Sequence, residues 1–75
     1  MTELKIAERL KELRKEADLT QEQAGKKLYV CGNTCSNYER GERVPGIDFV
    51  VNAAEFFGVS LDYLVGLSDD REDEE

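Results

Sequence analysis

Five polar side chains that can exchange hydrogen bonds with a ligand lie close together in one short segment. They are Asn33, Thr34, Ser36, Asn37 and Arg40. The same segment has apolar side chains at Cys35 and Tyr38, a spacing typical of one face of an α-helix. Packing of that face would leave the polar side chains outward. There they can enter a DNA major groove, which is about 12 Å wide.

Enzymatic chemistry has little support in the sequence. The chain has no histidine, which is the commonest general base and metal ligand. Cys31 and Cys35 alone cannot complete a four-ligand zinc site, and no nucleophile–base pair is evident. We therefore expect no enzymatic activity, no cofactor, no metal and no small-molecule substrate in this domain. One thiol is expected to point inward and the other outward, so we expect no disulfide between them.

The sequence over residues 20–40 predicts a helix, a turn and a second helix. These elements must hold the polar segment in place. Thr20 and Gln23 have the spacing of a capping box, which predicts a helix that begins after Thr20. Gly25 in its middle costs about 1 kcal/mol relative to Ala, and a helix tolerates that where another backbone comes close. A turn at Tyr29 follows, and Gly41 is a plausible terminator of the second helix.

Helical periodicity predicts three more helices. One runs over residues 3–17, one over 47–57 up to Gly58, and a short one over 61–65 between Ser60 and Gly66. A chain of 75 residues has room for one small domain. Five helices with short connections predict an all-α, compact fold.

The helix expected over 47–57 has apolar side chains on two sides. One side holds Ile47, Val50, Val51, Ala54 and Phe57, and the nearly opposite side holds Phe49, Ala53 and Phe56. A helix that is apolar on both sides is buried on both sides. Two explanations stay open. Either the helix over 61–65 covers the second side, or Phe49, Ala53 and Phe56 form a subunit interface.

The formal net charge of −7 is concentrated at the end of the chain. The segment 68–75 holds six acidic residues and one arginine, a composition typical of a solvated, disordered tail. We therefore expect the domain to span residues 1–67, and the tail could compete for a phosphate-binding surface. No signal peptide or apolar run of membrane-spanning length is present, so we expect a cytoplasmic protein without a membrane partner. Whether the native chain continues past residue 75 stays open.

Four motifs together resemble the Cro/phage-repressor (Xre-type) DNA-binding domain. They are the segments 8–14 (ERLKELR), 19–22 (LTQE), 38–41 (YERG) with Pro45, and 57–64 (FGVSLDYL). The resemblance covers residues 4–66 and implies a five-helix, lambda-repressor-like fold in which the third helix is the recognition helix. Tyr29 stands where the family prefers glycine. Gly32 stands where a long base-contacting side chain is common.

The resemblance also implies a role for individual residues. Base edges would be contacted by Gly32, Asn33, Ser36 and Asn37, and phosphates by Gln21, Thr34, Arg40 and Arg43. An asparagine amide can meet N6 and N7 of adenine together. Arg14 and Glu39 would form a structural ion pair. The asparagines could instead be ordinary caps or surface residues, and the two arginines solvated loop charges.

Two functions from different classes follow. The first is a sequence-specific transcriptional regulator, a repressor, that binds double-stranded DNA as a homodimer on a two-fold symmetric operator. The second is a protein-interaction module of the same fold, an antitoxin or regulatory subunit, whose negative charge suits a basic partner. Salt-dependent duplex binding separates them, because phosphate contacts weaken steeply as salt rises. A redox switch of the cysteines within the recognition helix is a further hypothesis, which unchanged DNA affinity under oxidant and reductant would dismiss.

Overall fold

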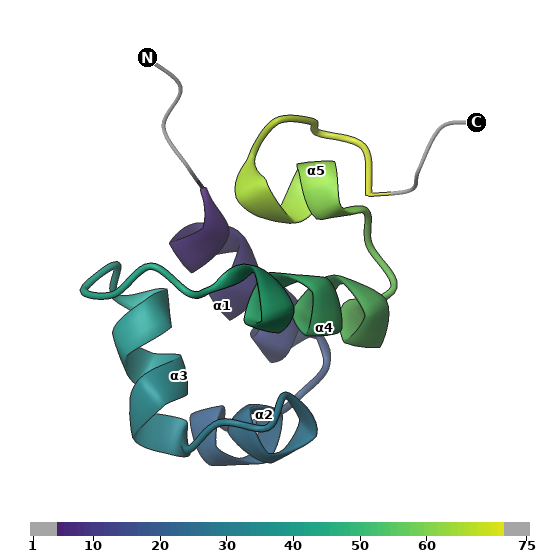
Figure 1. Cartoon of the computed structure of the whole chain (residues 1–75). Coiled ribbons are helices and arrows are strands. Elements are labelled where there is room, and N and C mark those ends of the chain that lie inside the picture. Colours follow the sequence, from purple (N-terminus) through teal and green to yellow (C-terminus); the bar gives the residue numbers. More distant parts are fainter. Residues whose placement is uncertain (1–4, 72–75) are drawn as a thin grey trace.

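Local signals in the sequence place the helices of the computed structural model, which describes residues 5–71. The helices are α1 (Ile6–Glu16), α2 (Gln21–Lys27), α3 (Gly32–Glu39), α4 (Ile47–Phe57) and α5 (Leu61–Val65). No strand occurs between residues 5 and 71, so the predicted all-α, five-helix fold is confirmed. The predicted start of the first helix, at residue 3, lies outside the described residues. In Figure 1, α4 crosses the middle of the molecule, with α2 and α3 in the lower part of the view and α5 in the upper part.

The start of α2 has the predicted capping box. The Thr20 hydroxyl accepts a hydrogen bond from the Gln23 backbone N–H at 3.1 Å, and the Gln23 side chain accepts one from the Thr20 N–H at 2.9 Å. The predicted reason for Gly25 is also confirmed. A Cβ at this position would lie 2.6 Å from the carbonyl oxygen of Val30. Only glycine therefore lets the chain after α2 pass this close to the helix.

The turn between α2 and α3 contains a strained residue. Tyr29 has φ of +65°, in the left-handed region that L-residues other than glycine rarely occupy. Its side chain is 84% exposed, so little burial offsets this strain. The turn thus keeps the bend for which the family prefers glycine, and Tyr29 tolerates the strained conformation.

The core collects one apolar stripe from each of several helices. Leu10 and Leu13 of α1, Leu28 after α2, and Leu64 of α5 are buried together. The first and last helices pack on each other, and α1 also packs on α3. None of the helices in the described range is long and apolar enough to cross a membrane.

The buried face of α4 corrects the predicted dimer interface. Phe49 and Ala53 are 7% and 0% exposed, and they lie in the core beside Val50 and Ala54. At 100° per residue these four side chains fill an arc of about 140°. The arc takes two of the five residues on one predicted side and two of the three on the other. Only Phe56 of the three interface candidates is exposed, at 42%.

The side of α4 that holds Phe49 and Ala53 is covered by other helices of the same chain. The ring of Phe49 packs against the ring of Tyr38 on α3, with centroids 4.7 Å apart at 61°. Edge-to-face contacts of this kind are favourable between aromatic rings. Phe49 is thus buried by α3 as well as by its own helix, which the sequence analysis did not anticipate.

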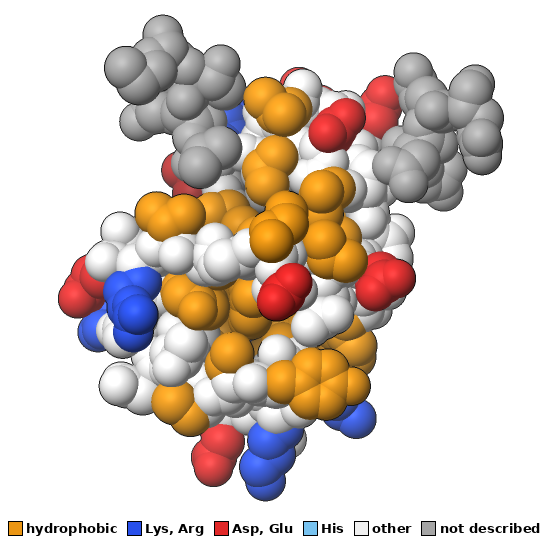
Figure 2. Space-filling view, viewed as in Figure 1, with side chains coloured by type: hydrophobic (Ala, Val, Ile, Leu, Met, Phe, Trp, Pro, Cys, Tyr) orange, Lys and Arg blue, Asp and Glu red, His pale blue; other side chains and the backbone are white. Residues whose placement is uncertain are grey.

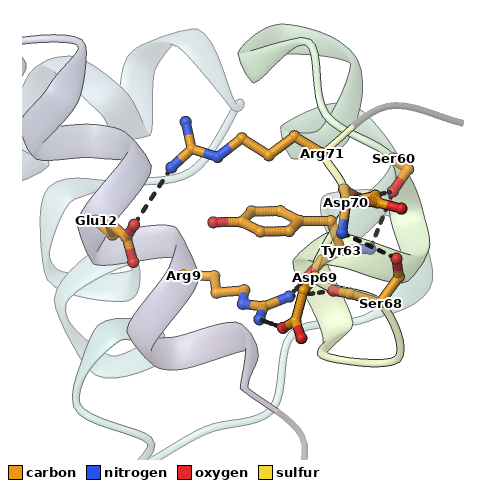
Figure 3. A network of polar contacts seen from close by, with 8 residues as sticks. All are labelled: Arg9, Glu12, Ser60, Tyr63, Ser68, Asp69, Asp70 and Arg71. Carbon is orange, nitrogen blue, oxygen red and sulfur yellow. Dashed lines mark hydrogen bonds and ion pairs between the residues drawn. The ribbon is translucent and has the colours of Figure 1, made fainter.

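Part of the predicted disordered tail lies against the folded domain. Arg9 on α1 donates hydrogen bonds to the carbonyl oxygen of Ser68 and to the carboxylate of Asp69, the latter at 2.8 Å. The Ser60 hydroxyl donates to the carbonyl oxygen of Asp70 at 3.2 Å. Figure 3 shows these groups converging between α1 and α5. The described residues of the tail therefore contact the helical domain up to Arg71, and the tail residues 72–75 lie outside the described residues.

Two arginines, Arg9 and Arg71, lie on either side of the Tyr63 ring. The guanidinium carbons of Arg9 and Arg71 lie 4.1 Å and 5.2 Å from the ring centroid of Tyr63, and Figure 3 shows the ring between them. Arg71 also pairs with Glu12 at 3.2 Å and Glu16 at 2.7 Å on α1. In Figure 1 this segment lies beside α5, away from α3. The described part of the tail thus does not cover the predicted recognition helix.

Candidate functional site

The inner and outer faces of α3 differ sharply. Cys35 and Glu39 are buried at 0% and 8% exposure, one helical turn apart. Asn33 is exposed, while Ser36 and Asn37 are half-buried. A helix this short and polar needs such anchoring, because isolated helices of this length are unstable in water. The structure therefore holds α3 by its apolar side and leaves its amides and hydroxyls outward.

Three of the four predicted base-contacting residues share one hollow with the start of α2. This open hollow of about 460 Å³ is lined by Gln21, Glu22, Gly32, Asn33 and Ser36. Asn37, the fourth, does not line it. Sequence analysis missed Glu22, whose only sequence signal is its place in the first helical turn, where a carboxylate suits the helix dipole.

Gly32 brings the two helices of this site together. A Cβ at Gly32 would lie 3.1 Å from the Cα of Glu22. The missing side chain therefore permits a close approach between the start of α3 and the start of α2. This gives Gly32 a packing role, while its predicted contact with a base edge stays a prediction.

A charged pair fixes α3 to α1. The guanidinium of Arg14 lies against the carboxylate of Glu39, with Nε 2.6 Å from Oε2 and Nη2 3.1 Å from Oε1. Arg14 also donates to the carbonyl oxygen of Leu19 at 2.8 Å. The two side chains are 12% and 2% exposed. Arg14 thus serves the structure and is not available to a ligand.

The same carboxylate orients Gln21. The amide nitrogen of Gln21 donates to Oε1 of Glu39 at 3.2 Å. Burial by itself raises the pKa of Glu39, but the hydrogen bonds from Arg14 and Gln21 outweigh burial and hold the pKa below its ordinary value. One amide hydrogen of Gln21 is already used, so the predicted phosphate contact would use the other.

Arg40 is bound on two sides. Its Nη2 donates to Oδ1 of Asn37 at 2.6 Å, and its Nε lies 2.9 Å from Oε2 of Glu42. Sequence analysis missed Glu42, whose signal was an acid two residues after an arginine. Arg43 is exposed and has no ion pair among residues 5–71. Both arginines stay predicted phosphate contacts, and Arg43 is the one whose charge is not neutralised by a described carboxylate.

The two thiols at the site have opposite environments. Cys31 is exposed before the first turn of α3, and its Sγ lies 3.1 Å from the hydroxyl of Thr34. That hydrogen bond lowers the pKa of Cys31. Burial raises the pKa of Cys35 to about 11. Both thiols are free, and among residues 5–71 no group of three His, Cys, Asp or Glu side chains is placed to hold a metal ion.

Comparison with known proteins gives a consistent answer. A family model described as helix-turn-helix matches residues 10–64. The transcriptional regulator ImmR of Bacillus subtilis (strain 168) is 41% identical over 63 residues, which are 84% of this chain and 50% of that protein. The phage CTXphi transcriptional repressor RstR of Vibrio cholerae is 35% identical over 69 residues, 92% of this chain and 62% of that protein. The chain thus spans about half to three fifths of these relatives.

Two solved structures share the fold. A transcriptional regulator from Listeria innocua superposes with a TM-score of 0.82 at 35% identity, over 87% of this chain and 61% of that one. The P22 c2 repressor protein, solved in complex with a synthetic operator, superposes with a TM-score of 0.76 at 28% identity. That match covers 80% of this chain and 91% of the repressor chain.

Proposed function

Because the chain belongs to the helix-turn-helix family of phage-repressor type, we propose that it is the sequence-specific DNA-binding domain of a transcriptional regulator that acts as a repressor. Its partner is double-stranded DNA, and α3 is the element that enters the major groove. The cytoplasmic location and the absence of enzymatic activity expected from the sequence stay predictions within this proposal.

The observation that carries the proposal is the outward polar flank of α3. An α-helix with its side chains is about 10–12 Å across, close to the width of the major groove. Asn33 is exposed and Ser36 is half-buried beside it, and no other described segment lines their hollow except the start of α2. The helix can therefore approach base edges without a rearrangement of the domain.

Charge supports a local rather than a global attraction to DNA. The chain as a whole carries −7, which opposes non-specific binding to phosphates. Arg40 and Arg43 follow α3 directly. Arg40 is paired with Glu42, so it is the charge of Arg43 that stands unneutralised beside the proposed recognition helix among the described residues. Phosphate contacts of this kind fix the orientation of a protein on the duplex, and base contacts supply the sequence preference.

We further propose a homodimer, because one recognition helix reads too few base pairs for a unique site. Figure 2 shows hydrophobic side chains gathered over α4 and α5 on one face. The exposed large apolar residues in and beside these helices are Val44, Ile47, Val51, Phe56, Leu61 and Leu67. Ile47 and Val51 lie one turn apart on α4 and replace the buried Phe49 and Ala53 as the centre of the proposed interface.

Duplex selection tests the DNA-binding function. Random duplexes incubated with the purified protein at two salt concentrations should yield a two-fold symmetric motif, with affinity that falls as salt rises. Asn33→Ala should weaken preference at one position in each half-site. Lys15→Ala on α1, outside the proposed interface, is the matched control. Absence of any salt-dependent binding would refute the proposal and favour the protein-interaction module.

Sedimentation tests the dimer separately. Ile47→Ser should shift the protein toward monomer, because it places a hydroxyl in the proposed apolar contact. Tyr29→Ser is the matched control, since Tyr29 is a large exposed side chain outside α4 and α5. A monomer for the unmodified protein at high concentration, or equal shifts for both variants, would contradict this interface.

A further inference from the structure

Three side chains at the end of α3 and just after it, those of Asn37, Arg40 and Glu42, form a chain of contacts. Arg40 donates from Nη2 to Oδ1 of Asn37 at 2.6 Å, and its Nε pairs with Oε2 of Glu42 at 2.9 Å. The side chains of Arg40 and Glu42 are 55% and 60% exposed. Exposed pairs of this kind contribute little to stability. We therefore consider what these contacts do to the orientation of the Asn37 side chain.

The contact with Arg40 determines which end of the Asn37 amide faces outward. A guanidinium carries hydrogen-bond donors only, so the Asn37 atom that it contacts must be the carbonyl oxygen Oδ1. The amide nitrogen then lies on the other side, with both hydrogens available. Charge assistance makes such a bond short and comparatively strong. A flipped amide would place two sets of donors against each other.

We propose that Arg40 is a positioning residue that turns the amide N–H groups of Asn37 outward, and that Asn37 thereby prefers guanine over adenine. This inference rests on the proposed function. Guanine presents two acceptors in the major groove, N7 and O6, whereas adenine presents the acceptor N7 and the donor N6. Adenine N6 would have to donate to an oxygen that already accepts a hydrogen bond from the cationic Arg40, so adenine would meet only its second lone pair. Guanine meets only the outward N–H groups of Asn37 and the positive charge beside them.

Asn33 provides an internal contrast on the same helix. Its side chain is exposed and makes no hydrogen bond to another side chain among residues 5–71. Its amide group can therefore turn as a whole, so the amide oxygen and nitrogen of Asn33 can meet the donor N6 and the acceptor N7 of adenine together. Two asparagines four residues apart on α3 thus have different base preferences, because only one of them is held by an arginine.

Glu42 completes the arrangement. A carboxylate near the phosphates works against DNA binding by repulsion, but this carboxylate is paired with Arg40. By pairing with Nε, it fixes the guanidinium plane and keeps Nη2 directed at Asn37. Glu42 is in this way a second positioning residue, which acts on Asn37 through Arg40.

The orientation of Asn37 can be tested without DNA. The side-chain NH₂ signals of Asn37, assigned by their loss in Asn37→Asp, are followed in amide proton–nitrogen spectra of the full chain. Arg40→Met should shift these signals, because it removes the partner of Oδ1. Arg43→Met is the matched control, since it removes an equal charge three residues later, and should leave them in place. Unchanged signals in Arg40→Met would overturn the inference.

Duplex selection then tests the base preference. Asn37→Ala should flatten one position of the selected motif, which identifies the base that Asn37 contacts. At that position the unmodified protein should prefer guanine over adenine by about tenfold, and Arg40→Met should bring the ratio close to one. Arg43→Met should weaken binding to all sequences without altering this ratio.

Two results would overturn the inference, and a third concerns the proposed function. Preference for adenine at the Asn37 position, or the same ratio in Arg40→Met as in the unmodified protein, would show that Arg40 does not set the preference. If no protein in the set, the unmodified one included, enriches any duplex, the proposed function fails. In that case the amide spectra still decide whether Arg40 orients Asn37.

Discussion

Arg14→Met removes one member of the ion pair that ties α3 to α1, and its cost follows from the burial of the other member. Glu39 has a side chain only 2% exposed, and it receives two hydrogen bonds from Arg14 at 2.6 Å and 3.1 Å. In Arg14→Met the carboxylate keeps its hydrogen bond from Gln21 but loses the opposite charge. Breaking a buried pair by removing one partner costs about 3–5 kcal/mol.

That cost is large for a chain of this size. Domains have unfolding free energies of about 0.05–0.15 kcal/mol per residue, which is on the order of 4–11 kcal/mol here. Urea unfolding followed by circular dichroism should therefore show Arg14→Met with a much lower midpoint than the unmodified protein. A double variant, Arg14→Met with Glu39→Leu, should recover at least half of the loss, since replacing both members of a buried pair by apolar side chains is often neutral.

An exposed pair supplies the control for this measurement. Arg40 and Glu42 lie at a similar distance, 2.9 Å, but both are more than half exposed. Arg40→Met should therefore cost less than about 1 kcal/mol. A loss below 1 kcal/mol for Arg14→Met, or a double variant as unstable as Arg14→Met alone, would refute the argument that buried charge makes this pair important.

The same pair predicts an acid dependence. The pKa of Glu39 is below its ordinary value in the folded protein, because the hydrogen bonds from Arg14 and Gln21 outweigh the effect of burial. A lowered folded-state pKa adds stability above the unfolded-state pKa of about 4.3, and this stability disappears as pH falls through the folded value. The stability difference between the unmodified protein and Arg14→Met should thus shrink below about pH 4.

Three further predictions concern α2, the turn that follows it and the two cysteines at α3. Gly25→Ala should lower the unfolding free energy by about 1–3 kcal/mol, because the new Cβ would lie 2.6 Å from the Val30 carbonyl oxygen; a neutral result in urea would mean that the backbones separate easily. Tyr29→Gly should raise it by about 1 kcal/mol, since φ is +65° and the side chain is 84% exposed; an unchanged midpoint would contradict this. A thiol reagent at about pH 8 should modify Cys31 quickly and Cys35 only after unfolding, because Cys31 is exposed with a lowered pKa while burial raises the pKa of Cys35 to about 11; equal rates in the single-cysteine variants would refute it.

Helix positions and the helix-turn-helix were determined by the sequence itself, because their signals are local. The capping box at Thr20 and Gln23, and the terminators Gly58 and Gly66, act within one helical turn of the residues they affect. The bounds predicted for α4 and α5 match the structure for that reason. Gly25 was informative because a glycine within a helix signals a close backbone contact.

Tertiary structure alone decided which side of α4 is buried and where residues 68–71 pack on the domain. An apolar pattern on both sides of a helix does not say which side meets Tyr38, so the sequence left open whether Phe49 and Ala53 form an interface or are covered within the chain. The structure places both in the core. The contacts of Arg9 with Asp69 join residues 60 positions apart. Partners so distant are chosen by the packing of α5 against α1, and no local pattern of charge or hydropathy encodes that choice.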